Sequence, residues 1–194
     1  MRRTSLHCNN VQPLKLMTLL TATFMLAGVF LVLGGLFASR AEFFEKAIKA
    51  LPRSQIATVL LFGAGAAWFL SIIVHLGEAD FGAYRQWLFL LFLVVAMGAF
   101  FVVPDFLAVR GLSILTLLSA RPLLDAAYLQ LPSSRLVFVS LVYVLIVLAL
   151  YLAAMPYRWR DFFNWLYTST MRPRALGCLL IVCAAGLALA ATLY

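Results

Sequence analysis

The charged side chains that interrupt an otherwise apolar segment are the first candidates for chemistry in this sequence. Arg110, Arg121 and Asp125 all lie within residues 106–131. Charged residues inside a membrane-spanning segment often mark the path of an ion, a proton or a substrate. Arg110 and Arg121 are eleven residues apart, about three helical turns, so a helix would place both on one face. Asp125 follows Arg121 by one turn, and we expect these two side chains to pair.

A second interpretation of these three residues is structural. Arg110 and Arg121 would lie about 16 Å apart along a helix, so each is close to its own boundary of a hydrocarbon core about 30 Å thick. From there a long arginine side chain can reach the head groups. Ile114, Leu117 and Leu118 lie between the arginines on the same face and would interrupt a polar path. The sequence favours boundary arginines and a local ion pair, and a transport path stays the alternative.

Histidines and carboxylates give weaker signals. His75, Glu78 and Asp80 are close in sequence, but one histidine with two carboxylates is not a specific metal-binding pattern. His7 and His75 would lie on the same side of the membrane, yet neither is placed like a buried haem ligand. The motifs of zinc proteases, P-loop proteins, serine hydrolases and dinucleotide-binding folds are missing from the sequence. We therefore expect no enzyme activity, no metal site and no cofactor.

The three cysteines indicate neither a disulfide framework nor a metal site. Cys8 precedes the first apolar segment, whereas Cys178 and Cys183 lie within the last one. Five residues of helix place Cys178 and Cys183 about 140° apart around the axis, so they do not face a common ligand. We interpret both as small packing residues.

The elements that carry these residues follow from composition. Of the 194 residues, 65% are apolar and 11% are charged, whereas an ordinary soluble domain is about 45–50% apolar and about 25% charged. A small soluble particle cannot bury that much apolar surface. The composition excludes a soluble enzyme, a disordered chain and a disulfide-rich secreted module. It predicts an all-α bundle of helices in a membrane.

Six apolar segments have about the 20 residues that a helix needs to cross a bilayer. The first is longer than the apolar region of a signal peptide, which is about 7–15 residues, so we expect a retained helix. The fourth is the only one that contains charged residues, and five spans are the alternative if it lies in the membrane surface. The predicted spans of this single domain are 16–39, 56–76, 87–103, 107–124, 136–155 and 175–194.

Two further segments, 41–53 and 156–171, alternate apolar and charged residues with helical spacing. In the first, Glu42 and Lys46 form one of two favourable i,i+4 pairs on the polar face. In the second, tryptophan and phenylalanine residues gather on one face. Such patterns are typical of helices that lie in the plane of the membrane interface.

Stripes of small residues predict where spans approach one another closely. Gly63, Ala67 and Ser71 recur every four residues in the second span, and Gly186 and Ala190 do so in the last. Small side chains let the backbones of two membrane helices come into contact. We expect both stripes at helix–helix contacts instead of facing lipid.

The net charge of +8 comes from 15 Lys and Arg against 7 Asp and Glu. With six spans, the loops that contain the amphipathic segments hold eight of the basic residues and the opposite side holds five. The positive-inside rule then places loop 156–174 in the cytoplasm and both termini outside. With five spans the N-terminus would be inside, but loop 156–174 and the C-terminus keep their sides. The basic residues thus mark membrane boundaries and predict no nucleic-acid partner.

The sequence therefore predicts a multi-pass protein of the lipid bilayer, with a bacterial inner membrane as the expected location. Because chemical motifs are missing and small-residue stripes are present, we expect a non-enzymatic accessory, scaffold or sensor component. It would act through helix–helix association, as a homo-oligomer or with other membrane subunits. The alternative is a transporter or channel for a small solute or lipid that uses Arg110, Arg121 and Asp125.

Overall fold

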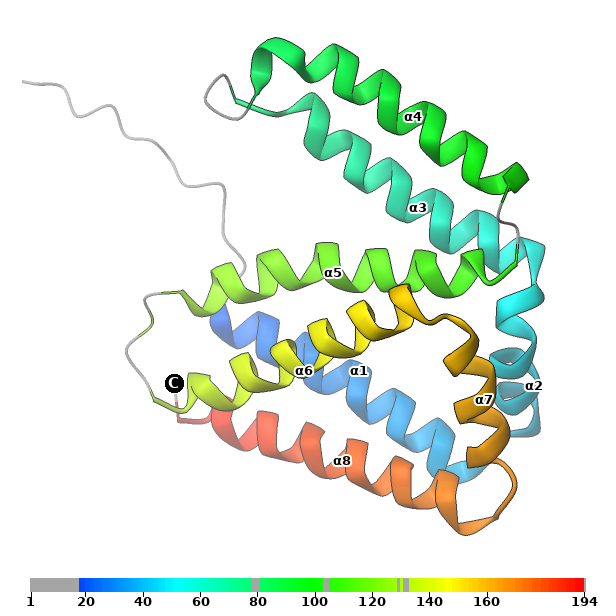
Figure 1. Cartoon of the computed structure of the whole chain (residues 1–194). Coiled ribbons are helices and arrows are strands. Elements are labelled where there is room, and N and C mark those ends of the chain that lie inside the picture. Colours follow the sequence, from blue (N-terminus) through cyan, green and yellow to red (C-terminus); the bar gives the residue numbers. More distant parts are fainter. Residues whose placement is uncertain (1–17, 78–80, 103–104, 129, 131–132, 194) are drawn as a thin grey trace, which may run out of the picture.

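The computed structural model describes residues 18–77, 81–102, 105–128, 130 and 133–193, and within these ranges the secondary structure is helical (Figure 1). This confirms the predicted all-α class. The elements are α1 (Leu19–Ser39), α2 (Glu42–Ala50), η1 (Leu51–Arg53), α3 (Gln55–Val74), η3 (Gly82–Tyr84), α4 (Arg85–Val102), α5 (Leu107–Ala127), α6 (Arg135–Ala154), α7 (Tyr157–Leu166) and α8 (Met171–Ala191).

Six of these helices are long and apolar enough to cross a membrane, and α5, the fourth, is one of them. The six-span prediction is confirmed at this level, and the five-span alternative is not supported. The two short helices α2 and α7 run across the ends of the long helices at one end of the molecule (Figure 1). Both belong to the segments predicted to be amphipathic.

Two predicted boundaries need correction. Helix α5 does not end at 124 but continues to Ala127, and Pro122 lies inside it. Neighbouring helices allow a membrane helix to tolerate an internal proline. Helix α8 begins at Met171 and so includes residues that we assigned to the in-plane segment and the loop after it. Pro173 lies in its first turn, where proline costs no hydrogen bond.

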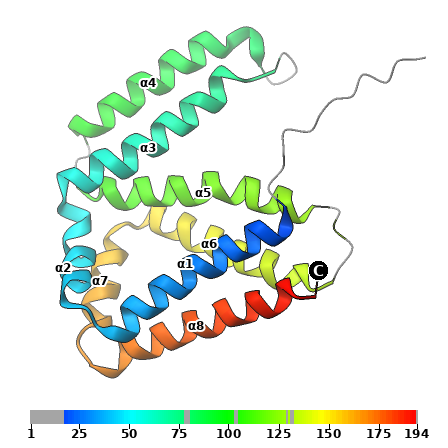
Figure 2. The same ribbon diagram turned by 180° about the vertical axis from the view of Figure 1, so that it is seen from behind.

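The most extensive helix contact is formed by α1 and α8, which lie side by side and antiparallel (Figure 2). A methyl group built on Gly34 would lie 2.9 Å from the carbonyl oxygen of Gly177, and one built on Gly177 would lie 2.7 Å from that of Gly34. Only glycine permits this approach, since any side chain would meet backbone atoms of the other helix.

The main hydrophobic cluster lies at the end of the bundle opposite α2 and α7. It combines the first half of α1 with the last half of α5, the first half of α6 and the last half of α8. Phe138 and Leu187 are fully buried within it. The buried hydroxyl of Thr23 donates to the carbonyl oxygen of Leu19 at 2.8 Å, so it is satisfied within its own helix.

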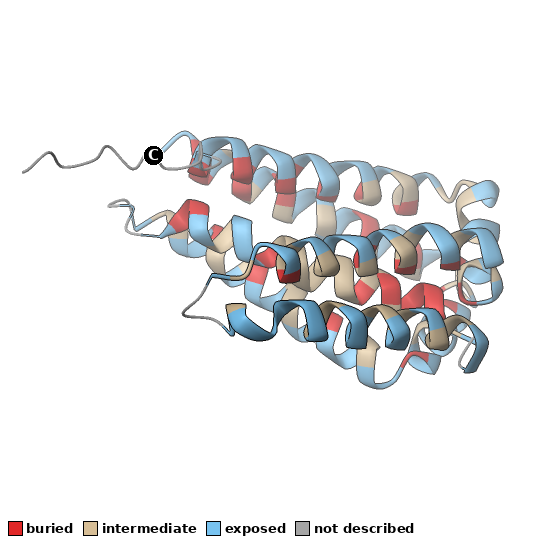
Figure 3. Cartoon of the chain, turned by 90° about the horizontal axis from the view of Figure 1, so that it is seen from above, coloured by how far each residue is buried: buried red, intermediate tan, exposed pale blue. Residues whose placement is uncertain are grey.

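Helices α3 and α4 form a hairpin that joins this bundle through α5 (Figure 1). Two edge-to-face ring pairs hold the hairpin, Phe62 with Phe100 and Phe69 with Phe92, with centroids 5.2 and 5.0 Å apart. No described residue of α4 is buried, as the view from its side of the molecule shows (Figure 3). The hairpin therefore presents most of its apolar surface to its surroundings.

Candidate functional site

The three charged residues of α5 do not converge on a common cavity. The Nε of Arg121 lies 4.0 Å from a carboxylate oxygen of Asp125, so the predicted local pair is present. Both side chains are exposed, at 78% and 54%. Arg110 lies near the start of the helix, about three turns from Arg121 and about four from Asp125. This arrangement matches the structural interpretation of the charges better than a transport path.

The interior of the described bundle offers no continuous polar route beside these charges. Its buried polar side chains are Thr23, Thr58 and Ser113. Each of these hydroxyls donates to the carbonyl oxygen four residues earlier in its own helix. Such bonds satisfy a hydroxyl within its own membrane helix.

The stripe of Gly63, Ala67 and Ser71 faces away from the other helices of the chain. Ala67 and Ser71 are exposed, and a methyl group built on Gly63 would meet no atom within 4 Å. The described helices of this chain therefore do not cover the stripe, and its predicted helix–helix contact stays a prediction. Gly65, on another face of α3, packs against Ile114 of α5 instead. The two glycines are about 200° apart around the helix, and only the position of α5 decides which one is covered.

Of the two residues of the α8 stripe, one is buried within the chain and the other is only partly buried. Ala190 is 5% exposed and belongs to the buried face of the helix, as predicted. Gly186 is only partly buried, and a methyl group built on it would meet no atom within 4 Å. The close approach to α1 occurs at Gly177, more than two turns earlier in α8.

The weaker candidates form no site among the residues that the structure describes. The ring Nδ1–H of His75 donates a hydrogen bond to the carbonyl oxygen of Ser71 at 2.7 Å, at the end of α3. No group of three metal-binding side chains is found in the described ranges. His7, Cys8, Glu78 and Asp80 lie outside them. Cys178 is exposed and Cys183 is partly buried.

The two amphipathic helices pack against each other and form a layer across one end of the bundle. The indole N–H of Trp159 in α7 donates to the carbonyl oxygen of Ile48 in α2 at 3.1 Å. The ring of Phe163 stacks on Phe37 at the end of α1, with centroids 6.1 Å apart. Ile48, Phe163 and Leu166 are buried there. We call this arrangement the α2–α7 layer.

Tyr167 lies at the edge of the α2–α7 layer, where its phenol has a raised pKa. Burial is the main cause, the negative charge of Glu45 raises the pKa further, and the positive charge of Arg40 opposes both. The ammonium group of Lys49 lies 5.1 Å from the centre of the Tyr167 ring. The protonated phenol is therefore the form that this layer stabilises.

This raised pKa predicts a loss of stability at alkaline pH. In the unfolded chain Tyr167 loses its proton near its ordinary pKa of about 10, whereas the folded chain still holds it. The free energy of unfolding should not respond to Tyr167 below that pH and should fall as pH rises toward the raised pKa. Thermal unfolding in detergent over a pH series measures this fall. Tyr167→Phe should be less sensitive to alkaline pH, and parallel losses in both proteins would contradict the assignment.

An apolar groove of about 550 Å³ lies beneath α7. The connection between α6 and α8 contains α7, which at ten residues is about 15 Å long and runs across this end of the bundle. At the opposite end of the bundle α6 and α8 join the same hydrophobic cluster. The two helices therefore diverge toward α7. Volumes of about 300–1,000 Å³ are typical of ligand sites.

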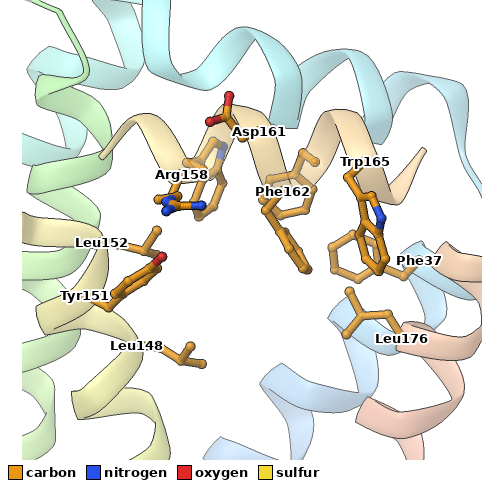
Figure 4. Close-up of a pocket in the computed structure, with 11 residues that line it drawn as sticks. Phe37, Leu148, Tyr151, Leu152, Arg158, Asp161, Phe162, Trp165 and Leu176 are labelled. Atoms are coloured by element: carbon orange, nitrogen blue, oxygen red, sulfur yellow. The ribbon is translucent and has the colours of Figure 1, made fainter. Parts of the chain in front are cut away.

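The groove has apolar walls and a polar rim (Figure 4). Leu148, Leu152 and Leu176 line its sides, and aromatic residues of α7 cover it. Arg158 and Tyr151 lie on the same flank in Figure 4, whereas the carboxylate of Asp161 points away from the opening. Asp161 pairs with Arg160 at 3.2 Å.

A second apolar groove, of about 410 Å³, lies between the hairpin and α5. Phe69, Phe92 and Leu117 are among its lining residues, and none of its lining residues is charged. The charged residues of α5 line neither groove.

Sequence reasoning identified the aromatic face of α7 but missed the groove beneath it. Leu148 and Tyr151 belong to a span with no polar interruption, so nothing in their own segment distinguishes them from lipid-facing residues. The available signal was the helical segment between the last two spans, since it must hold their ends apart.

Comparisons with protein families, with curated proteins and with solved structures find no match for this chain.

Proposed function

We propose that this multi-pass protein is a non-enzymatic accessory or scaffold component of a membrane assembly, and that copies of the chain associate through the outward face of α3. The outward position of Gly63, Ala67 and Ser71 carries this proposal. Small residues at four-residue spacing let another membrane helix approach closely, whereas a helix that meets only lipid gains nothing from them. No described residue of neighbouring α4 is buried, so the same side of the chain has further apolar surface for a second copy to cover.

The proposal includes an orientation. Phe106 N–H donates to the carbonyl oxygen of Pro52 at 3.2 Å, so the loop before α5 lies at the same end as the α2–α7 layer. The segments at that end, including the first turn of α8, contain eight of the fifteen Lys and Arg residues: Arg40, Lys46, Lys49, Arg53, Arg158, Arg160, Arg172 and Arg174. By the positive-inside rule this end is cytoplasmic, and a bacterial inner membrane is the proposed location.

Disulfide crosslinking in native membranes tests the association. The three native cysteines are replaced by serine, and a single cysteine is placed at Ala67. Oxidation should give a crosslinked dimer, because Ala67 would face its equivalent in the second copy. Val147→Cys is the matched control, since Val147 is 64% exposed on α6, away from α3.

The proposed orientation is tested in the same cysteine-free protein. A single cysteine at Thr168, in loop 156–174, should react with a membrane-impermeant thiol reagent only after the cells are opened.

A bulky residue in the stripe should weaken the dimer without unfolding the chain. Leucine at Ser71 cannot be accommodated in a close helix contact, and overpacking of this kind costs about 1–3 kcal/mol. We expect the association constant of the dimer to fall about tenfold or more in mild detergent. A monomer in every condition, or equal crosslinking at Ala67 and Val147, would contradict the proposed association.

A further inference from the structure

We propose that the groove beneath α7 binds an anionic phospholipid, with an acyl chain between α6 and α8 and the head-group phosphate at Arg158. This inference is independent of the proposed association, which involves α3. Three features of the groove carry it: its depth, its lateral opening and the charge at its rim.

The depth of the groove fits a lipid chain. Leu148 lies six residues, about 9 Å along the axis, before the end of α6 next to α7, and Leu176 lies at a similar distance from the start of α8. The lining is almost entirely apolar between these levels. An apolar ligand that enters from the bilayer would exchange one hydrocarbon environment for another, so the walls supply shape and the rim supplies specificity.

The exposure of the lining residues shows that the groove is open. Leu148 and Trp165 are about half exposed, at 50% and 54%. Trp159 also lines the groove, and its indole N–H is held by the carbonyl oxygen of Ile48. A chain can therefore enter sideways from the surrounding lipid while the head group stays at the level of α7.

The charge of Arg158 selects an anion. The carboxylates of Glu42, Glu45 and Asp161 pair with Lys46, Lys49 and Arg160. No described carboxylate lies within ion-pair distance of Arg158, whose guanidinium lies 5.6 Å from the ring of Tyr157. A guanidinium binds a phosphate through two parallel hydrogen bonds. The Tyr151 hydroxyl on the same flank is a further donor (Figure 4).

Quenching of tryptophan fluorescence by brominated lipids tests the site. Trp68 and Trp87 are replaced by phenylalanine, which leaves Trp159 and Trp165 at the groove. The protein is reconstituted with phosphatidylglycerol or phosphatidylcholine that carries bromine on matched acyl chains. We expect phosphatidylglycerol to associate about five times more strongly, the factor typical of one basic side chain near an anionic lipid.

Charge variants then assign the preference to Arg158. R158Q should bring the ratio of the two association constants close to one, and R158K should keep most of it. R174Q removes the same charge from an exposed position outside the groove and should leave the ratio unchanged. Thermal unfolding checks that each variant is folded. If R158Q does not fold, Tyr151→Phe serves as the second variant and should lower the ratio of the two association constants partially.

Three results would overturn this proposal. Equal quenching by the two lipids in the parent protein would show that the groove has no head-group preference. Retention of the ratio in R158Q would exclude Arg158 as the phosphate ligand. An equal loss in R174Q and R158Q would show a diffuse surface attraction instead of a site. Each outcome is independent of crosslinking at Ala67.

Discussion

Replacing Gly111 by alanine should separate the α3–α4 hairpin from the rest of the bundle. The new methyl group would lie 2.6 Å from the Cα of Phe62 and 2.8 Å from the carbonyl carbon of Leu61. These are backbone atoms of α3, so no side chain can rotate away to make room. The two helices must move apart, and the contact between Gly65 and Ile114 next to it would loosen as well.

We expect Gly111→Ala to lower the free energy of unfolding by about 1–3 kcal/mol, the range for overpacking of a close contact. Denaturation in mixed detergent micelles measures the change. Gly98→Ala on α4 is the matched control, because its methyl group would meet no atom within 4 Å. It should be neutral or slightly stabilising, since alanine favours a helix more than glycine does. Equal effects of the two substitutions would contradict the packing of α3 on α5.

Replacing Gly177 by alanine should disrupt the most extensive helix contact of the bundle, between α1 and α8. Its methyl group would lie 2.6 Å from the backbone nitrogen of Ala38 and 2.7 Å from the carbonyl oxygen of Gly34. The end of α1 would be displaced from α8. Because Phe37 at that end packs against Phe163, the displacement would also disturb the α2–α7 layer.

Gly177→Ala is thus expected to cost about 1–3 kcal/mol from overpacking and to change the fluorescence of Trp159 in the α2–α7 layer. Gly186→Ala on the same helix is the control, because its methyl group would meet open space. Unfolding in detergent and the emission spectrum report the two effects separately. A stable Gly177→Ala protein with an unchanged spectrum would contradict the close approach of α1 and α8.

The spans and amphipathic segments were predictable because the surroundings of each segment, lipid or water, determine its pattern of apolar and polar residues. A segment such as 136–155 is apolar along its whole length, and this alone gives its length and class. The pairing of Arg121 with Asp125 was also predictable, since residues four apart on a helix are neighbours. These features need no knowledge of distant parts of the chain.

The faces that helices present to one another could not be predicted in the same way. Gly63 and Gly65 are equally suited to a close contact, and the choice depends on Gly111, which lies in another span. Likewise, the contact of Gly177 with Gly34 joins opposite ends of the sequence. Hydropathy carries no information about such pairs, because inside a membrane the lipid-facing and the buried sides of a helix are both apolar.

The pairing of α1 with α8 also determines when the bundle can close. These are the first and last of the described spans, so α1 enters the membrane well before its principal neighbour has been synthesised. Until then the face of α1 around Gly34 is in contact with lipid or with another protein. Contacts between residues so far apart in sequence form late in folding. The hydrophobic cluster that joins α1, α5, α6 and α8 is therefore completed after translation of α8. A chain that stops before α8 would expose the α1 surface to mispairing or proteolysis.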